Sequence, residues 1–223
     1  MASEMNEERV DELDEQPTEA SCTHNCSTCS ANCSSKKGEP ESLIEPQNTA
    51  SNIKHVIGVV SGKGGVGKST VAANLAVALA GLGYRVGLLD ADIFGPSMPK
   101  MFNTEGARPY AENKGGRDLI IPVEQYGIKL LSIGYFVDPE QAVLWRGAMA
   151  SNALKQLIAD ADWGELDYFI IDMPPGTGDV PLTVFQSIAL DGIIIVTTPQ
   201  DLVSMIVDKA VKMAQMMNVP VLG

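Results

Sequence analysis

Apolar residues beyond residue 52 fall into short runs, and stretches with helical length and spacing separate these runs. Short apolar runs that end at polar residues, glycine or proline are typical of strands buried on both faces. The predicted strands are 56–60, 86–89, 120–123, 128–132, 168–171 and 193–196. The predicted helices are 68–80, 147–159, 182–189 and 202–217. This alternation predicts an α/β domain with a mostly parallel sheet and helices on both of its faces.

The first 52 residues show no such periodicity and are rich in serine, threonine, asparagine, glutamate and proline. Segments of this composition cannot bury enough apolar surface to fold alone, so we expect a largely disordered tail at 1–52 and a folded domain at 53–223. The last five residues, Val219–Gly223, have the pattern of a further strand that stops at its beginning. We therefore expect the domain to be truncated at its carboxyl end.

The net charge of −12 is unevenly distributed, because residues 1–50 alone carry a net charge of −8. An acidic tail is typical of a solvated arm and disfavours nonspecific binding to nucleic acid or to an anionic membrane. The first 20 residues contain no apolar run like that of a secretory signal, and no run of 18 apolar residues would span a bilayer. We expect a cytoplasmic protein with no nucleic-acid or membrane partner.

A glycine-rich segment joins the first predicted strand to the first predicted helix. It has the pattern G-x-x-x-x-G-K-S of a phosphate-binding loop, and its residues are Gly62, Lys63, Gly64, Gly65, Val66, Gly67, Lys68, Ser69 and Thr70. Glycines allow backbone N–H groups to surround phosphate oxygens at the start of a helix. In such a loop Lys68 reaches the β- and γ-phosphates of ATP, and Ser69 holds Mg²⁺. The alternative is an ordinary glycine-rich turn.

Three aspartates follow predicted strands, and ligands of open α/β sheets bind at the carboxyl ends of strands. Asp92 would orient the attacking water, and Asp90 would hold a water bound to Mg²⁺. A turn or a helix cap is the alternative for both. Asp172 ends an apolar strand and is expected to face Mg²⁺, as a Walker B acid does. Gly176, in the loop that follows, would donate its N–H group to the γ-phosphate.

All four cysteines of the chain lie within twelve residues of the tail, in the pattern C-x3-C-x2-C-x3-C. They are Cys22, Cys26, Cys29 and Cys33. Clustered thiolates suit either a tetrahedral Zn²⁺ ion or an iron–sulfur cluster, and the spacing alone does not choose between them. Free thiols and disulfides are alternatives, although a reducing compartment disfavours disulfides.

Together these motifs resemble those of the Mrp/Nbp-type P-loop ATPases, which are iron–sulfur cluster carrier proteins. The resemblance covers about 54–223, and its most specific runs are D-A-D-I-F-G-P-S at 90–97 and D-M-P-P-G-T-G-D at 172–179. Lys63-Gly64-Gly65 is similar to the deviant phosphate-binding loop of the wider MinD/ParA superclass. The resemblance implies a homodimer that binds ATP, hydrolyses it slowly and transfers clusters, with [4Fe–4S] the expected type, to apo iron–sulfur proteins. It also implies that Lys63 reaches the partner subunit's nucleotide and acts in catalysis with Lys68 and Asp92.

The chain departs from the family pattern at two places. The family has a C-x-x-C pair through which two subunits share a cluster, whereas no cysteine follows Cys33 in this chain. Ala148 stands where the family usually has proline, which is a minor change.

Two other functions would use the same loop chemistry. A positioning ATPase of the MinD/ParA kind would need a basic or amphipathic surface segment, and the sequence shows none. A zinc-binding module would hold Zn²⁺ on the tail and carry a nucleotide-binding domain that does not turn over.

Overall fold

The structure is a computed structural model that describes residues 44, 48–137, 147–176, 178–199 and 201–223. The described residues belong to one compact unit. The four tail cysteines lie outside the described residues, so the predictions made for them are not tested by the structure. Each helix in the described part of the chain is too short or too polar to span a lipid bilayer.

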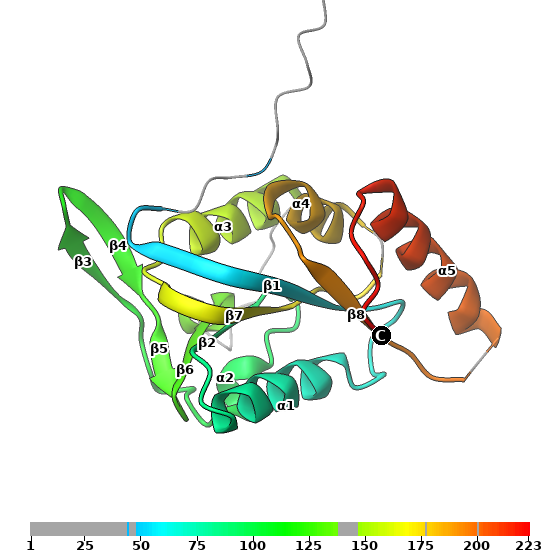
Figure 1. Cartoon of the computed structure of the whole chain (residues 1–223), viewed down its shortest axis with the longest axis horizontal. Coiled ribbons are helices and arrows are strands. Elements are labelled where there is room, and N and C mark those ends of the chain that lie inside the picture. Colours follow the sequence, from blue (N-terminus) through cyan, green and yellow to red (C-terminus); the bar gives the residue numbers. More distant parts are fainter. Residues whose placement is uncertain (1–43, 45–47, 138–146, 177, 200) are drawn as a thin grey trace, which may run out of the picture. The chain divides into compact units, whose positions relative to one another are not determined.

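A six-stranded sheet forms the centre of the unit, in the order β5-β6-β2-β7-β1-β8 (Figure 1). Its strands are β1 (Ser51–Ser61), β2 (Val86–Asp90), β5 (Val123–Gln125), β6 (Ile128–Ser132), β7 (Gly164–Asp172) and β8 (Gly192–Val196). Neighbouring strands are parallel except for β5 and β6, which form an antiparallel pair at one edge. The mostly parallel sheet expected from the sequence is confirmed.

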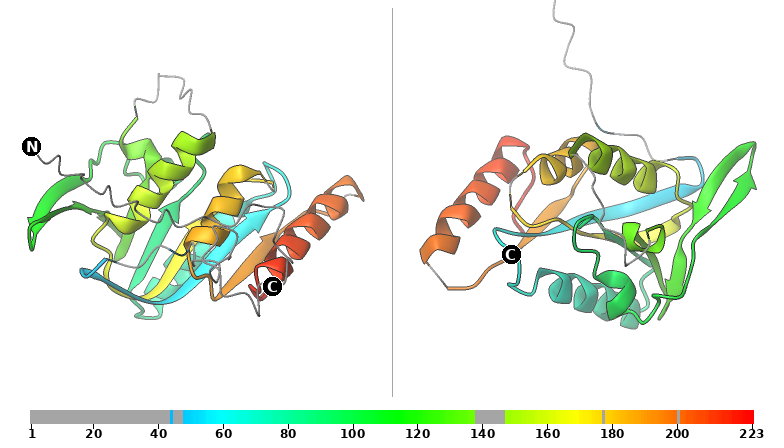
Figure 2. Two further views of the ribbon diagram at one scale, coloured as in Figure 1. Left: turned by 90° about the horizontal axis from the view of Figure 1, so that it is seen from above. Right: turned by 180° about the vertical axis from the view of Figure 1, so that it is seen from behind.

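Helices cover both faces of this sheet, as the sequence predicts (Figure 1, Figure 2). On one face lie α1 (Lys68–Gly81) and the short α2 (Met98–Met101). On the other face lie α3 (Gly147–Ala159), α4 (Asp179–Ser187) and α5 (Asp201–Met216). Each face therefore has its own apolar core, and the central strands contribute side chains to both.

Strand alternation divides the residues of β1 between the two cores. Val56 and Val60 pack against the α3–α5 side, whereas Val59 packs against the α1 side. In β2 all five residues are buried, including Asp90 at its end. Burial on both faces explains why these strands read as continuous apolar runs rather than alternating ones.

A separate hairpin of β3 (Tyr110–Lys114) and β4 (Arg117–Ile121) was missed by the sequence analysis. Every residue of β3 is exposed, so this strand carries no apolar pattern. Pro122 ends β4, because proline has no N–H group to donate to a strand ladder. The predicted strand 120–123 was therefore wrong: its residues are divided between β4 and β5.

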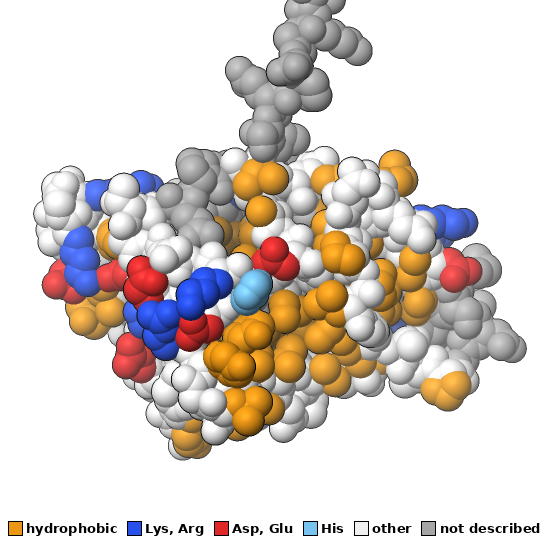
Figure 3. All heavy atoms as spheres, viewed as in Figure 1, with side chains coloured by type: hydrophobic (Ala, Val, Ile, Leu, Met, Phe, Trp, Pro, Cys, Tyr) orange, Lys and Arg blue, Asp and Glu red, His pale blue; other side chains and the backbone are white. Residues whose placement is uncertain are grey.

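Ion pairs join the amino ends of β1 and β7 to the loop before β2. The Asp167 carboxylate lies 2.8 Å from the Lys54 ammonium group and 3.0 Å from the Arg85 guanidinium group. Hydrogen bonds from Arg85 and Lys54 hold the pKa of Asp167 far below its usual range. Figure 3 draws one face of the molecule, on which acidic and basic side chains are intermingled beside an area of apolar side chains.

The described domain begins before the predicted boundary at residue 53. The Asn48 side chain donates to the carbonyl oxygens of Ala159 and Ala161, at 2.8 and 2.7 Å. β1 then starts at Ser51. Residues 48–52, which the sequence analysis placed in the tail, are therefore tied to the connection between α3 and β7.

The carboxyl-terminal residues lie along β8 in the way that the sequence predicts for the beginning of a strand. The Leu222 N–H donates to the Ile193 carbonyl at 2.8 Å, and the Ile195 N–H donates to the Gly223 carbonyl at 2.9 Å. An isolated parallel bridge pairs Val221 with Ile193.

Candidate nucleotide-binding site

The predicted phosphate-binding loop connects the end of β1 at Ser61 to the start of α1 at Lys68. Gly65 and Gly67 have φ angles of +79° and +91°, a region that side chains with a Cβ atom rarely adopt. Gly67 occupies the N-cap position of α1, and no side chain caps the helix there. The N-cap residue thus offers no side-chain acceptor to the first N–H groups of α1, and N–H groups left open at a helix start can bind a phosphate anion.

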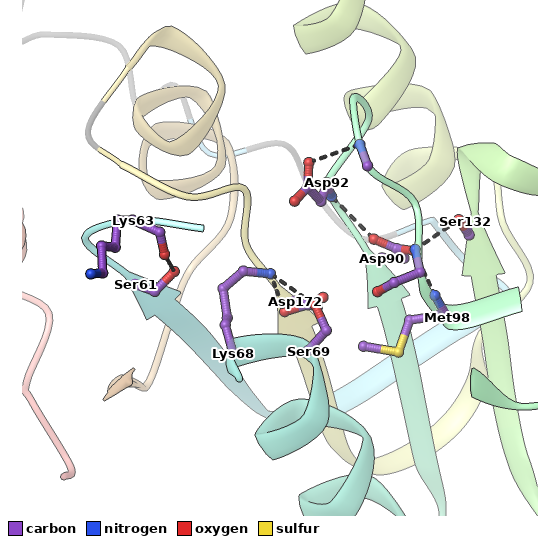
Figure 4. Close-up of polar contacts among 11 residues, drawn as sticks. Ser61, Lys63, Lys68, Ser69, Asp90, Asp92, Met98, Ser132 and Asp172 are labelled. Carbon is purple, nitrogen blue, oxygen red and sulfur yellow. Dashed lines mark hydrogen bonds and ion pairs between the residues drawn. The ribbon is translucent and has the colours of Figure 1, made fainter. Parts of the chain in front are cut away.

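Lys68 does not extend into solvent but forms a buried ion pair with Asp172 at the end of β7 (Figure 4). Its Nζ atom lies 2.5 Å from Asp172 Oδ1 and 3.3 Å from the Ser69 hydroxyl. Burial raises the pKa of Asp172, while the charge and hydrogen bond of Lys68 lower it. Lys68 must leave this carboxylate before it can reach a phosphate.

The second carboxylate oxygen of Asp172, Oδ2, is buried and has no hydrogen-bond partner among the described residues. A buried carboxylate oxygen without a partner is costly unless a ligand satisfies it. Ser69 lies at the same place, since its hydroxyl accepts a bond from Lys68. A carboxylate and a hydroxyl next to a phosphate site are oxygen ligands of the kind that Mg²⁺ takes, so these two residues fit that ion.

A cavity of about 220 Å³ lies over the loop. Its lining residues are Ser61, Lys63, Gly64, Gly65, Gly67, Lys68, Ser69, Thr70, Asp92 and Pro175. The fold thus brings most of the predicted loop residues together with Asp92. Ligand pockets for whole drug-sized molecules usually measure about 300–1,000 Å³, so this cavity suits the phosphate end of a nucleotide better than the complete molecule.

Five of the predicted nucleotide-site residues do not line this cavity: Gly62, Val66, Asp90, Asp172 and Gly176. The Gly176 N–H, which we expected to meet the γ-phosphate, donates to the Ser61 carbonyl at 2.9 Å. Gly176 has a φ angle of +87° in the loop after β7. Contact between its N–H group and a phosphate would require this bond to break.

Asp90 is fully buried at the end of β2, level with Asp172 on β7 and Ser132 on β6. Burial raises the pKa of Asp90 to about 7, and the negative charge of Asp172 adds to the rise. Hydrogen bonds from the Met98 and Ser97 amides and from the Ser132 hydroxyl oppose that rise. Whether Asp90 also holds a magnesium-bound water stays a prediction.

Ser132 and Ser61 belong to this region, although the sequence analysis did not single them out. Ser132 donates to Asp90 Oδ2 at 3.1 Å, and Ser61 donates to the Lys63 carbonyl at 3.1 Å. Ser132 ends β6, which the strand order places beside β2. Each serine stands at the carboxyl end of a strand, where α/β sheets bind ligands, and this position in the sequence could have indicated both residues.

The candidate metal ligands of the tail, Cys22, Cys26, Cys29 and Cys33, lie outside the described residues. Among the residues that are described, no group of three or more histidine, cysteine, aspartate or glutamate side chains could hold a metal ion.

A parallel sheet, a glycine-rich loop that ends in Lys68 and Ser69 at the start of a helix, and an acid at the end of the neighbouring strand define a P-loop NTPase. The chain belongs to the ParA family, in the group described as NUBPL iron-transfer P-loop NTPases, whose model matches residues 52–223.

Similar proteins carry the name "iron-sulfur cluster carrier protein". The one from Aquifex aeolicus is 53% identical over 172 residues, which make up 77% of this chain and 46% of that protein. The one from Methanocaldococcus jannaschii is 47% identical over 210 residues, 92% of this chain and 71% of that protein. The chain thus spans about half the length of the Aquifex protein.

Solved structures agree with the fold. A nucleotide-binding protein from Archaeoglobus fulgidus in complex with ADP is 42% identical, with a TM-score of 0.66 over 77% of this chain and 65% of that chain. The cell division ATPase MinD of Pyrococcus furiosus is 21% identical, with a TM-score of 0.53 over 76% of this chain and 70% of that chain. At that identity the MinD likeness supports the fold alone.

Proposed function

We propose that this protein is an ATP-binding and ATP-hydrolysing carrier of iron–sulfur clusters that delivers its cluster to apo iron–sulfur proteins in the cytoplasm. The match of 52–223 to an iron-transfer NTPase family carries this proposal. The names of the relatives and the ADP in the Archaeoglobus structure support it. The cluster is the cargo of the protein, and [4Fe–4S] is the type we propose.

The nucleotide chemistry follows from the contacts around the loop. Lys68 would exchange its ion pair with Asp172 for the β- and γ-phosphates of ATP. Ser69 and Asp172 would hold Mg²⁺, which supplies charge neutralisation at the phosphates when it is bound. Asp92 lines the cavity and would orient the attacking water. Gly176 would give up its bond to the Ser61 carbonyl and donate to the γ-phosphate.

We also propose that two subunits associate through the face that carries the cavity. Lys63 lies in the cavity wall and would reach the partner subunit's nucleotide. Large apolar side chains are exposed on elements that leave the carboxyl ends of the strands, among them Phe94, Phe136 and Leu182. Exposed apolar side chains beside a binding site are typical of a surface that a partner covers.

The cluster would be held by Cys22, Cys26, Cys29 and Cys33. The chain has no other cysteine, so any thiolate ligand that it supplies must come from these four. After anaerobic reconstitution with iron and sulfide, we expect charge-transfer absorbance that is lost in Cys26→Ser and Cys29→Ser. Ser27→Ala, in the same segment, should keep it. Zinc without sulfide in the purified protein would favour the zinc-binding module instead.

Isothermal titration calorimetry with Mg-ATP tests the nucleotide half of the proposal. We expect binding by the full chain and none by Lys68→Ala, with folding of the variant checked by circular dichroism. Lys100→Ala, an exposed change on α2, should bind normally. Equal heats from the full chain and from Lys68→Ala would refute the role of the loop.

A further inference from the structure

The buried carboxylate of Asp90 accepts four hydrogen bonds, three of them from one loop (Figure 4). Its Oδ1 atom accepts from the Asp92 N–H at 3.2 Å. Its Oδ2 atom accepts from the N–H groups of Ser97 and Met98, at 2.9 and 3.1 Å. The fourth donor is the Ser132 hydroxyl of β6, at 3.1 Å.

These donors mark the two ends of the segment that connects β2 to α2. Asp92 begins the turn, while Ser97 and Met98 end it at the first residues of α2. Within the turn, the Gly95 N–H donates to the Asp92 carboxylate at 3.2 Å. A single carboxylate therefore closes the loop at both ends, and the loop in turn fixes the Asp92 side chain.

The loop is supported from β6 as well. Ser132, which bonds Asp90, also accepts from the Gly134 N–H at 3.1 Å. A Cβ atom on Gly134 would lie only 3.1 Å from Pro96 and 3.3 Å from Pro99, so the loop packs directly on this glycine. Asp90 thus anchors a loop that has little room to move toward β6.

Asp90 and Asp92 differ in what they face. Asp92 is half-buried and lines the cavity over the phosphate-binding loop, whereas Asp90 is fully buried and does not line it. Both oxygens of Asp90 point at donors of the protein (Figure 4). This arrangement is that of a residue that shapes a neighbour rather than one that meets the ligand.

We infer that Asp90 is a positioning residue for ATP hydrolysis: it holds the loop 92–98 so that Asp92 is aimed at the attacking water. The inference rests on the proposed ATPase activity and on the role proposed there for Asp92. It replaces the expectation that Asp90 acts on a magnesium-bound water.

Steady-state ATPase kinetics of Asp90→Asn test the inference. The amide is the same size but sets an NH₂ group against backbone donors, so the loop loses its anchor. We expect kcat to fall about 10- to 100-fold, because a misplacement near 1 Å costs rates of that order. KM for ATP and the Mg²⁺ concentration for half-maximal rate should stay within about twofold. Ser132→Ala removes only one of the four hydrogen-bond donors to Asp90, so it should lower kcat less than Asp90→Asn does.

A double-mutant cycle separates positioning from a role of its own. If Asp90 acts through Asp92, then Asp90→Asn should not slow Asp92→Asn any further. Additive losses, or a raised Mg²⁺ requirement in Asp90→Asn, would overturn the inference. Asp167→Asn is the matched control, since it makes the same change in the amino-terminal half of β7, does not line the cavity and should leave kcat unchanged.

Hydrogen exchange on the nucleotide-free full chain gives a readout that does not depend on turnover. The amides of Asp92, Ser97 and Met98 should exchange slowly in the unaltered chain and fast in Asp90→Asn, while those of β1 do not change. Equal protection of these amides in both proteins would refute the inference and would leave the proposed ATPase activity of the unaltered chain unaffected. If Lys68→Ala and the unaltered chain released phosphate at the same rate, the proposed function would fail instead.

Discussion

Lys68 and Asp172 stand 104 positions apart in the sequence and form an ion pair that is almost completely removed from solvent. Removing one partner of a buried pair leaves an uncompensated charge, whereas removing both is often tolerated. In the nucleotide-free protein, each of these residues therefore stabilises the buried charge of the other. The same two residues are the ones that we propose bind phosphate and magnesium. On ligand binding, phosphate would neutralise the charge of Lys68, and Mg²⁺ would neutralise that of Asp172.

We predict that Lys68→Met lowers the free energy of unfolding by about 3–5 kcal/mol in the absence of nucleotide. Lys68→Met combined with Asp172→Asn should recover most of that loss, because neither charge of the pair is left buried without its partner. Urea denaturation of the three proteins measures the difference. Lys54→Met removes an ion pair with a half-exposed lysine and should cost no more than about 1 kcal/mol. A double variant as unstable as the single one would contradict this explanation.

The raised pKa of Asp90 predicts a particular dependence of stability on pH. The folded protein holds the Asp90 proton up to a pKa of about 7, while the unfolded chain releases it near the ordinary aspartate pKa of 3.8. The stabilising contribution is therefore complete below the unfolded pKa and is lost as the pH rises to about 7. Relative to Asp90→Asn, the unaltered protein should lose roughly 2–3 kcal/mol between pH 5 and pH 8 in urea denaturation. Parallel pH profiles of the unaltered protein and Asp90→Asn would show that burial does not raise the pKa of Asp90.

At the scale of single elements, β2 is a strand that is buried along its whole length. It lies between β6 and β7. A Cβ atom on Gly87 would come within 2.6 Å of Leu166, 2.9 Å of Phe169 and 3.2 Å of Trp163. The glycine thus lets side chains from β7 and the turn before it close over the strand.

Gly87→Ala should therefore lower the free energy of unfolding by about 1–3 kcal/mol, the usual cost of an overpacked core. Gly81→Ala is the matched control, since a Cβ atom at the end of α1 would meet nothing within 4 Å. It should be neutral or slightly stabilising, because alanine favours the helix. Thermal or urea unfolding compares the two; equal effects would mean that the contacts at Gly87 relax without cost.

At the scale of the whole molecule, the parallel sheet gathers the functional side chains at one edge. Ser61, Asp90 and Asp172 end strands that neighbour one another or are separated by a single strand. Because the strands are parallel, their carboxyl ends meet on the same side, where an open α/β sheet binds its ligand. The apolar side chains exposed at this edge are the ones that we propose a second subunit covers.

The proposed dimer predicts that light scattering detects a doubled mass with Mg-ATP. Phe94 is 62% exposed in the loop that follows Asp92, and Leu82 is 75% exposed at the far end of α1. Phe94→Ser should weaken the dimer, whereas Leu82→Ser, which changes a side chain with a larger exposed fraction, should not. Equal weakening by both changes would place the interface elsewhere. A dimer that Lys63→Ala leaves intact but inactive would support a catalytic rather than an adhesive role for Lys63.

The sequence by itself determined the order and kind of the main elements, together with the phosphate-binding loop. The predicted helix at 147–159 and the predicted strand at 128–132 coincide with α3 and β6. Buried parallel strands need continuous apolar runs, and a loop that surrounds a phosphate needs glycines in fixed positions, so local residues carry both signals. The exposed strand β3 has no such requirement, and for that reason its residues gave no signal.

Only the tertiary structure decided which side chains meet. The strand order sets β7 between β1 and β2, which brings Asp172 to Lys68 and level with Asp90. Strand order depends on how the helices pack across both faces, and no local pattern in the chain encodes it. For the same reason, the sequence could mark Asp90 and Asp92 as neighbours at a strand end but could not tell which one is buried and which one faces the cavity.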